Sequence, residues 1–510
     1  MQLIESMSKL DELLLLARHN KFIALIGLGR ENCQFLKWLI EVVNFPKEQI
    51  LLADQKPLAQ AAAETLDCVQ NYGFSDWQCV FGQDYLSVLQ KPNLALVFKS
   101  PGIWSLKPEF QEFRKLYGED KILSSLVFFL EKYRPQIVGI TGTKGKSTTA
   151  NLTAHLINSV SDLKAVYCGN SVNLSPYVFW TILNQVIDPN LFFVLELSSF
   201  QLQDLGFSQI SPKYALITNY YVDHLDQHKD TQEYWASKDN LFLFQEPEDF
   251  CLVGPSVLQN SLHPELIANK VLTSTEVAIY KQTFTSPLIG EHNWLNLALS
   301  LKVTEFITNK QVLAEKELYQ QAIISYPKLP HRLELVRTVQ LDNLTVNFFD
   351  DGYATDPDAV VAAIRSFNRP GEYLWLQLCG KDKGTPVENL FLAILEVQQN
   401  LSLFRVDFCG EIGLKVQNLF NQTLGLEPVT EVRSFRQTVI KNFTSLENIK
   451  ANFWAWFNQQ QQNLQAGSKL NLNGNLVLNI IFSPGGSSFD EFRNQQERAT
   501  WWVQQVQKLK

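Results

Sequence analysis

The stretch at residues 137–149 constrains the fold of this chain more than any other part of the sequence. It starts as an apolar, β-type run, breaks into the pattern Thr-Gly-Thr-x-Gly-Lys-Ser and then opens a helical pattern. Glycines let successive backbone N–H groups converge on an anion, and the following helix adds its positive N-terminal end. Lys146 can reach the outer phosphates of a nucleotide, and Ser147 can hold Mg²⁺. The stretch therefore predicts a phosphate-binding loop between a buried strand and a helix.

The spacing of this loop departs from the commonest phosphate-loop pattern. Gly139 and Gly145 enclose five residues rather than four, and Ile140 stands where the first glycine of that pattern would fall. A glycine-rich turn without function is the alternative. The flanks favour the functional interpretation, because a β-rich run precedes the loop and residues 147–159 carry apolar side chains at helical spacing.

The composition describes a globular chain with enough apolar residues for several cores. At 510 residues, two or three domains are expected, and 45% of the residues are hydrophobic and 19% charged. A formal charge of −8 argues against a general nucleic-acid or anionic-membrane binder. The seven cysteines form no Cys-x-x-Cys pair and are typical of reduced thiols. With no signal peptide or membrane-spanning run in the sequence, we expect a cytoplasmic monomer without nucleic-acid or membrane partners.

Three apolar runs lie in the first third; the first and third end in turns of small residues, and the second ends at a carboxylate. The run at 21–26 leads to Gly27-x-Gly29, with Asn32 in place of the third glycine of a dinucleotide fingerprint. Asp54 follows a second run at the distance expected of a residue that meets a ribose or base. A third run, 94–98, leads to Ser100 and Gly102. Ordinary tight turns remain the alternative, but in an open α/β sheet such turns meet in one crevice.

Candidate metal ligands follow two later β-type runs. Glu196 lies near the end of the apolar run 191–200, where a carboxylate is costly unless it is paired or coordinates a cation. Asp223, His224, Asp226 and His228 cluster after the run 214–218. Oxygen donors without a nearby cysteine favour Mg²⁺ or Mn²⁺ over Zn²⁺. A surface glutamate and a solvated polar loop are the alternatives.

The last third repeats the pattern of strands that end in polar turns. The runs 346–349, 374–378 and 476–482 lead to the turns 350–358, 379–384 and 483–489, which predicts another doubly wound sheet. Upstream, Asn293 and Asn296 share one helix face and can read a nucleobase or cap the helix. Residues 442–470 carry no chemistry that the sequence identifies, and 501–510 is typical of an amphipathic helix that packs on the last domain.

The order of these motifs resembles the Mur ligase family over nearly the whole chain. The resemblance rests on the compact phosphate loop, the Glu-Leu-Ser-Ser strand end, the Asp-His-Leu-Asp cluster, the Gly-x-His-Asn-x-x-Asn helix and the His-Arg-x-Glu segment. It implies an α/β fold of three domains. These are a Rossmann-like UDP-substrate domain (1–133), a central P-loop ATPase-type domain that binds ATP (134–330) and a Rossmann-like amino-acid-binding domain (331–510).

The resemblance is greatest to the branch of the family that adds D-glutamate. It implies an ATP-dependent ligase that joins D-glutamate to UDP-N-acetylmuramoyl-L-alanine through an acyl phosphate, in peptidoglycan precursor synthesis. Sibling ligases with another amino acid, such as L-glutamate, or with a folate-type acceptor remain alternatives. So does a nucleotide-binding module without catalysis, whereas a dinucleotide oxidoreductase would leave the second phosphate loop unexplained.

The resemblance also assigns roles to single residues. ATP would be held by Gly142, Thr143, Lys144, Gly145, Lys146, Ser147, Thr148, Asn293, Asn296, Arg332 and Asp351. Two Mg²⁺ ions would be held by Ser147, Glu196, His224 and a carbamylated Lys238, a lysine that composition alone would leave at the surface. Catalysis would rest on Lys146, Glu196, His224 and Lys238. The UDP-substrate would contact Gly27, Gly29, Asp54, Ser100, Gly102 and Asn170, and the amino acid would contact Thr355, Lys383, Ser488 and Phe489.

Departures from the family pattern fall mostly in the amino-acid pocket. Tyr353 stands where a lysine is common, and Asp356 adds a negative charge. A dicarboxylate pocket with less positive charge is expected to bind glutamate more weakly.

Overall fold

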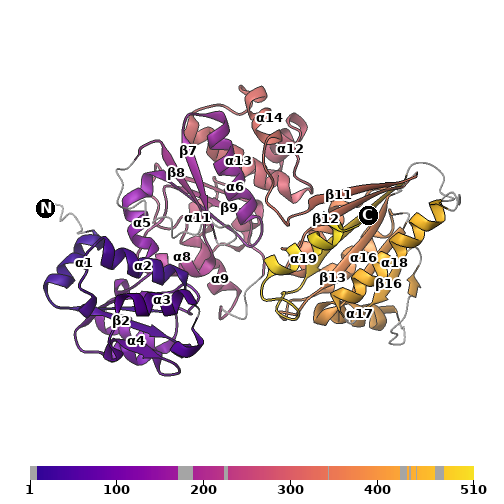
Figure 1. Cartoon of the computed structure of the whole chain (residues 1–510). Coiled ribbons are helices and arrows are strands. Elements are labelled where there is room, and N and C mark those ends of the chain that lie inside the picture. The colour runs from indigo at the N-terminus through magenta and orange to yellow at the C-terminus, as the bar shows by residue number, and fades with distance from the viewer. Residues whose placement is uncertain are drawn as a thin grey trace. The chain divides into compact units, whose positions relative to one another are not determined.

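The computed structural model describes residues 8–61, 63–169, 188–222, 228–342, 344–370, 372–401, 403–424, 433–435, 438–443, 445–465 and 476–509. The chain forms two compact units, one of Met1–Thr285 with Trp294–Tyr326 and one of Ser286–Asn293 with Pro327–Lys510. Both units are built from sheets and interleaved helices (Figure 1), so the predicted α/β class is confirmed. Three separate sheets are present, and the predicted boundaries at 133/134 and 330/331 stay predictions.

The first sheet has the parallel order β3-β2-β1-β4-β5, the strand order of a Rossmann fold. Its central strands are almost continuously apolar, as expected of a parallel sheet that is covered on both faces. The strands are β1 (Phe22–Ile26), β2 (Ile50–Asp54), β3 (Cys79–Phe81), β4 (Leu94–Lys99) and β5 (Ile122–Leu123). The helices are α1 (Lys9–Arg18), α2 (Arg30–Glu41), α3 (Ala63–Tyr72), α4 (Pro108–Tyr117) and α5 (Leu126–Tyr133), with 3₁₀ turns η1 (Lys47–Gln49), η2 (Leu58–Gln60), η3 (Asp76–Gln78), η4 (Tyr85–Gln90), η5 (Glu119–Lys121) and η6 (Arg134–Gln136).

The second sheet, also parallel, has the order β10-β9-β6-β8-β7, with β6 at its centre. Every position of β6 is buried, and the loops after β6, β8 and β9 leave the same edge of the sheet. The strands are β6 (Ile137–Thr141), β7 (Lys164–Cys168), β8 (Leu191–Glu196), β9 (Tyr214–Ile217) and β10 (Phe250–Val253). The helices are α6 (Lys146–Val160), α8 (Ser199–Phe207), α9 (Thr231–Asp239), α10 (Pro255–Asn260), α11 (Pro264–Ile267), α12 (Ser274–Thr283), α13 (His292–Thr308) and α14 (Lys316–Ile324).

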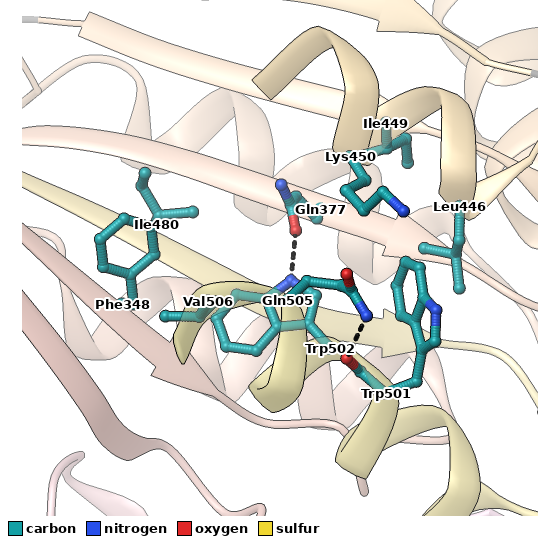
Figure 2. Close-up of a pocket in the computed structure, with 10 residues that line it drawn as sticks. All are labelled: Phe348, Gln377, Leu446, Ile449, Lys450, Ile480, Trp501, Trp502, Gln505 and Val506. Carbon is teal, nitrogen blue, oxygen red and sulfur yellow. Dashed lines mark hydrogen bonds between the residues drawn. The ribbon is translucent and has the colours of Figure 1, made fainter. Parts of the chain in front are cut away.

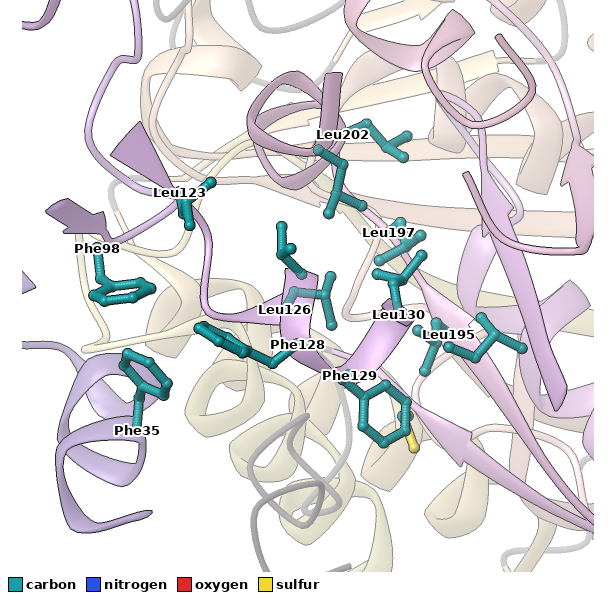
Figure 3. Close-up of a cluster of buried hydrophobic side chains, with 14 of the residues drawn as sticks. Phe35, Phe98, Leu123, Leu126, Phe128, Phe129, Leu130, Leu195, Leu197 and Leu202 are labelled. Carbon is teal, nitrogen blue, oxygen red and sulfur yellow. The ribbon is translucent and has the colours of Figure 1, made fainter. Parts of the chain in front are cut away.

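One hydrophobic core joins these two sheets within the first unit. In Figure 3, Leu126 and Leu130 of α5 lie between two groups of side chains. One group is aromatic and comes from the first sheet and its helices, and the other consists of leucines from the second sheet and the residues after β8. The aromatic residues are Phe35 and Phe98, and the leucines are Leu195, Leu197 and Leu202. Because the core is continuous, a shift of the first sheet relative to α5 would disturb the packing of α5 against the second sheet.

The second unit holds a seven-stranded mixed sheet in the order β11-β12-β17-β13-β14-β16-β15. The two edge pairs, β11 with β12 and β15 with β16, are antiparallel, and the pairs between them are parallel. The strands are β11 (Glu334–Leu341), β12 (Leu344–Asp350), β13 (Tyr373–Cys379), β14 (Leu403–Phe408), β15 (Arg433–Phe435), β16 (Thr438–Asn442) and β17 (Leu476–Gly485). The helices are α15 (Pro357–Ser366), α16 (Glu388–Val397), α17 (Gly410–Leu424), α18 (Leu446–Gln465) and α19 (Gln495–Gln507).

The C-terminal helix packs on this sheet, as the sequence predicts. Trp502 and Val506 of α19 are buried in a core with residues of the strands and of α18. Trp502 Nε1 donates to Gln377 Oε1 at 2.8 Å, and Figure 2 shows this bond in a small pocket between α18, α19 and the sheet. The segment 442–470, for which the sequence identifies no chemistry, contributes α18 to the core of the second unit.

All seven cysteines are free thiols, and six of them are buried. Burial raises the pKa of the Cys251 thiol to about 12, so this thiol stays protonated at neutral pH. No described helix combines the length and the apolar character that a membrane crossing requires.

Candidate active site

The phosphate loop has a backbone that only glycine fits at two positions. Gly142 has φ +142° and Gly145 has φ +82°, and α6 begins directly after the loop. A Cβ on Gly142 would lie 1.9 Å from Thr218 Oγ1, and a Cβ on Gly145 would lie 2.4 Å from Asn296 Oδ1. Both the backbone conformation and the lack of space therefore demand glycine here.

The end of β9 holds the loop in place. Thr143 N donates to Asn219 O at 2.9 Å, and Lys144 N donates to Asn219 Oδ1 at 2.9 Å. Thr218 Oγ1 donates to Lys144 O at 2.5 Å. Sequence reasoning missed Thr218 and Asn219, although a Thr-Asn pair directly after a buried strand was a usable signal.

Two lysines meet at one carbonyl of the loop. Lys146 Nζ donates to Gly142 O and to Thr143 O, each at 3.0 Å, and Lys238 Nζ donates to Gly142 O at 3.0 Å. Lys238 is 1% exposed, and its ammonium lies 4.6 Å from the centre of the Tyr234 ring. Positive charge and the N-terminal end of α6 are thus gathered at one place, and such surroundings stabilise an anion such as a phosphate. The structure thus brings together two of the lysines that the resemblance assigns to catalysis.

Glu196 ends β8 beside the phosphate loop. The parallel register places it next to Ile140 of β6, two residues before Gly142. Tyr167 OH donates to Glu196 Oε2 at 2.8 Å, while Oε1 accepts no hydrogen bond from the described residues. Ser147, in the first turn of α6, is 4% exposed. A carboxylate with an uncommitted oxygen and a hydroxyl are hard oxygen donors, which fit a Mg²⁺ ion.

Two predicted residues of this site, Asn170 and His224, lie outside the described residues. The second metal ion, for which His224 is the predicted ligand, therefore stays a prediction. Thr148, which the resemblance assigns to ATP, lies in the first turn of α6 beside Ser147.

Asn296 lies next to the phosphate loop, on α13. It is 3% exposed, and Ser300, one turn further along, donates from its hydroxyl to Thr149 O at 3.2 Å. The predicted partner Asn293 belongs to the second unit and donates from Nδ2 to Ile289 O at 2.7 Å. Both residues belong to α13, and contact of their amides with a nucleobase stays a prediction.

The three turns of the first sheet meet as predicted. Leu28 N donates to Asp54 Oδ2 at 2.7 Å, which ties the turn after β1 to the end of β2. Ser100 N donates to Ile26 O at 2.8 Å, and a Cβ on Gly27, which has φ +82°, would lie 2.8 Å from Ser100 Cβ. Gly29 caps the N-terminus of α2, and Gly102 has open space where a Cβ would be. A ligand at this edge would meet all three turns.

In the second unit, Asp351 is a buried carboxyl. Ser483 Oγ donates to its Oδ2 at 2.7 Å, and Leu333 N donates to its Oδ1 at 3.3 Å. Burial raises the pKa of Asp351 to about 7, with the hydrogen bond from Ser483 and the nearby Arg332 opposing the shift. The Arg332 guanidinium lies 6.0 Å from the Tyr353 ring. The assignment of Arg332 and Asp351 to ATP stays a prediction.

The loops predicted to hold the amino acid converge at the carboxyl ends of β12, β13 and β17. Lys383 Nζ donates to Thr355 Oγ1 at 3.3 Å. Lys381 and Ser487 exchange backbone hydrogen bonds of 2.9 and 3.0 Å, which link the second loop to the third. In that third loop Ser488 is 2% exposed and Phe489 is 73% exposed. The structure therefore brings Thr355 and Lys383 into contact and places Ser488 and Phe489 on an adjoining loop.

Sequence reasoning missed Arg498 of α19, which lies beneath these loops. It is fully buried, and its guanidinium donates to Gly486 O at 3.0 Å and to Gly352 O at 3.4 Å. Nothing in the sequence of the tail marks this arginine. Asp356, in contrast, has a structural role, because its Oδ1 caps α15 by accepting from Ala359 N at 3.1 Å. Its negative charge is therefore compensated by a helix N-terminus.

A second feature that sequence reasoning missed is a group of His331, Glu334 and Asp350, whose ligand atoms lie within 4.8 Å of one another. His331 N donates to Glu334 Oε2 at 3.0 Å, and the imidazole makes a short hydrogen bond to Asp350. Burial lowers the pKa of His331, but the hydrogen bond to Asp350 and the negative charges of Asp350 and Glu334 together outweigh this and leave the pKa raised. His331 and Asp350 thus form a local ion pair between the start of β11 and the end of β12.

Comparison with known proteins gives matches across this site. Residues 140–304, which contain the phosphate loop, Glu196, Lys238 and Asn296, match the Mur ligase middle domain. Over 388 residues, 72% of this chain, the sequence is 26% identical to a UDP-N-acetylmuramoylalanine–D-glutamate ligase of Clostridium botulinum (strain 657 / Type Ba4), of which 77% is covered. Over 439 residues it is 26% identical to the enzyme of that name from Lawsonia intracellularis (strain PHE/MN1-00), with 83% of each chain covered. A solved structure, the UDP-N-acetylmuramate-alanine ligase of Thermotoga maritima, has a TM-score of 0.47 and 15% identity, covering 96% of this chain and 100% of that chain.

Proposed function

We propose that the chain is an ATP-dependent ligase of the Mur ligase family that adds D-glutamate to UDP-N-acetylmuramoyl-L-alanine. The family assignment rests on the matched middle domain and on relatives that align over most of the chain. The choice of D-glutamate rests on the names of those relatives and on the greater resemblance to that branch of the family.

The observation that carries this proposal is the pair of ammonium groups at Gly142 O. Lys146 and Lys238 both donate to that oxygen, within a loop whose glycines expose backbone N–H groups at the start of α6. Such a loop binds the phosphates of ATP and neutralises the charge that moves during phosphoryl transfer.

The proposed reaction has two steps. A carboxylate is a poor acyl donor, so its oxygen first attacks the γ-phosphorus of ATP, and ADP leaves. The amine of the incoming amino acid then attacks the acyl carbon, the C–O bond to phosphate breaks, and inorganic phosphate and a proton are released. In this scheme Lys146 and the loop amides hold and orient the transferred phosphoryl group.

Ser147 and Glu196 are the residues that would hold Mg²⁺, which when bound neutralises charge on the phosphate oxygens. Glu196 is suited to this role because Tyr167 fixes one oxygen and the other accepts no bond from the described residues. Carbamylation of Lys238 would turn this buried cation into an anionic metal ligand, and its carboxylate oxygens would suit a divalent cation.

The amino acid is proposed to bind at the loops of the second unit. Lys383, in contact with Thr355, supplies a cation for a carboxylate, and Arg498 adds a second, buried cation beneath the same loops. Arg498 offsets part of the positive charge that is missing at Tyr353. We assign the reaction to the cytoplasm, where nucleotide-linked substrates and ATP occur, and a monomer is the expected state.

The proposal is tested with the purified full-length protein, ATP, Mg²⁺ and UDP-N-acetylmuramoyl-L-alanine. Phosphate release is expected only when an amino acid is added, and mass spectrometry is expected to show the D-glutamate adduct. An adduct with L-glutamate alone would assign the chain to a sibling specificity. If no phosphate is released with either enantiomer of glutamate or with any other amino acid, the ligase assignment is refuted.

A further inference from the structure

The turn after β4 is joined to the second sheet by a buried ion pair. Lys99, the last residue of β4, places its ammonium 2.9 Å from Asp204 Oδ2 on α8, and the two side chains are 0% and 2% exposed. The same ammonium donates to Ser100 O at 3.0 Å and to Ile103 O at 2.7 Å. Lys99 therefore fixes the path of the turn and holds it against α8 at the same time.

Further contacts strengthen this junction. Ser105 Oγ makes a short hydrogen bond to Asp204 Oδ1, and Arg114 of α4 donates to Ser105 O at 2.6 Å. The Arg114 guanidinium also lies 3.7 Å from the centre of the Phe207 ring on α8. The junction thus joins Lys99 of β4 to Asp204 of α8, and Arg114 of α4 to Phe207 of α8. Removing one partner of a buried ion pair is strongly destabilising because the other charge is left uncompensated.

A second set of contacts connects the turn to α9. Trp104 Nε1 donates to Glu233 Oε1 at 3.2 Å. The same oxygen lies 3.3 Å from His228 Nδ1, and His228 Nε2 lies 3.0 Å from Ser199 Oγ. Glu233 belongs to the first turn of α9, and Ser199 is the first residue of α8.

The two sets of contacts reach the elements that carry the proposed metal ligands. Two residues separate Glu196 from the start of α8. The first of them, Leu197, is fixed because its N donates to Ile140 O at 2.9 Å and its O accepts from Thr141 Oγ1 at 2.8 Å. Lys238 lies in the last turn of α9. The segment 99–105 is thus bonded to both helices, while its own Ser100 and Gly102 face the proposed uridine-nucleotide site.

We propose that the segment 99–105 couples the uridine-nucleotide site to the nucleotide–metal site, with Lys99, Trp104, Asp204 and Glu233 as positioning residues. This inference rests on the proposed function, because it takes Ser100 and Gly102 as contacts of the UDP-linked substrate. Substrate bound at the turn holds α8 and α9 in the arrangement that aligns Glu196 and Lys238 with the phosphate loop. By linkage, each ligand then tightens the binding of the other by the same factor.

The test measures the affinity of the full-length protein for ADP with Mg²⁺ by calorimetry, without and with saturating UDP-N-acetylmuramoyl-L-alanine. For the unmodified protein the substrate is expected to tighten ADP binding about fivefold or more. Trp104→Phe removes the indole donor and keeps an aromatic ring, and the double variant Lys99→Met with Asp204→Asn removes both charges without leaving one buried alone. Both are expected to reduce the effect to less than about twofold, with each ligand's separate affinity little changed. Trp77 is an exposed tryptophan of η3, just before β3, and Trp77→Phe is the matched control that is expected to retain the full effect.

Each outcome is decisive. Equal ADP affinity with and without substrate in the unmodified protein, or full coupling in both variants, would overturn this inference. If the protein ligates but shows no coupling, the proposed function stands and only the role of the segment 99–105 falls. If the UDP-linked substrate does not bind at all, both the proposed function and this inference fall.

Discussion

Replacing Gly145 with alanine tests the geometry of the phosphate loop. Gly145 has φ +82°, and an added Cβ would lie 2.4 Å from Asn296 Oδ1. A left-handed backbone conformation costs a residue with a Cβ about 1–2 kcal/mol. Forcing an extra methyl group into a packed site costs about 1–3 kcal/mol more. We therefore expect Gly145→Ala to lower the free energy of unfolding by about 2–5 kcal/mol.

Two further variants separate these contributions. Gly73 has φ +60° with no heavy atom within 4 Å of an added Cβ, so Gly73→Ala should carry only the backbone penalty, about 1–2 kcal/mol. In an Asn296→Ala background the clashing oxygen is gone, so Gly145→Ala should cost no more than Gly73→Ala does. The double-mutant cycle should then give a coupling energy of about 1–3 kcal/mol.

The assay is urea unfolding followed by far-UV circular dichroism, with ADP affinity measured on the same proteins. Loss of ADP binding in Gly145→Ala but not in Gly73→Ala would connect the strain to the site. The reasoning is refuted if Gly145→Ala costs no more than Gly73→Ala, or if removing the Asn296 amide leaves its cost unchanged.

Three other predictions follow from single residues. Folding raises the pKa of Asp351 from 3.8 to about 7, so its contribution to stability is present below the lower value and is lost as the pH rises through the upper one. The free energy of unfolding of Asp351→Asn, measured relative to the unmodified protein, should therefore be about 2 kcal/mol higher at pH 8 than at pH 5.5. Urea titrations in which both proteins show the same pH dependence would contradict this. Glu196→Gln should raise the Mg²⁺ concentration needed for half-maximal phosphate release at least about tenfold, whereas an unchanged requirement would exclude Glu196 as a ligand. Arg498→Lys keeps the charge but loses the guanidinium fork to Gly486 O and Gly352 O, so KM for the amino acid should rise while KM for ATP stays constant; a rise in both would argue for general destabilisation.

Residues close together in sequence accounted for much of what was predicted. The glycines of the phosphate loop, the start of α6 at Lys146 and the alternation of strands and helices follow from backbone conformation and hydrophobic pattern, which act over a few residues. The meeting of the turns after β1, β2 and β4 was also predictable, because the carboxyl ends of parallel strands share one edge of a sheet.

Contacts between distant segments could not be predicted from local pattern. Lys238 has the composition of a surface residue, yet the packing of α9 buries it and points it at Gly142 O, 96 residues away. Arg498 lies in a polar tail sequence, yet α19 places it beneath the loop that contains Gly352, 146 residues earlier in the chain. In each case the burial of the charge depends on which elements pack together.

The sequence by itself determined the α/β class, the phosphate loop and the set of polar groups at the strand ends, since these depend on local conformation and periodicity. Only the tertiary structure decided which of those groups meet. It brought Lys146 and Lys238 to one carbonyl oxygen and joined the turn at Lys99 to α8 through Asp204, 105 residues later in the chain. The physical reason is that the free energy of a buried charge depends on the partners that folding places around it, and these partners come from distant parts of the chain.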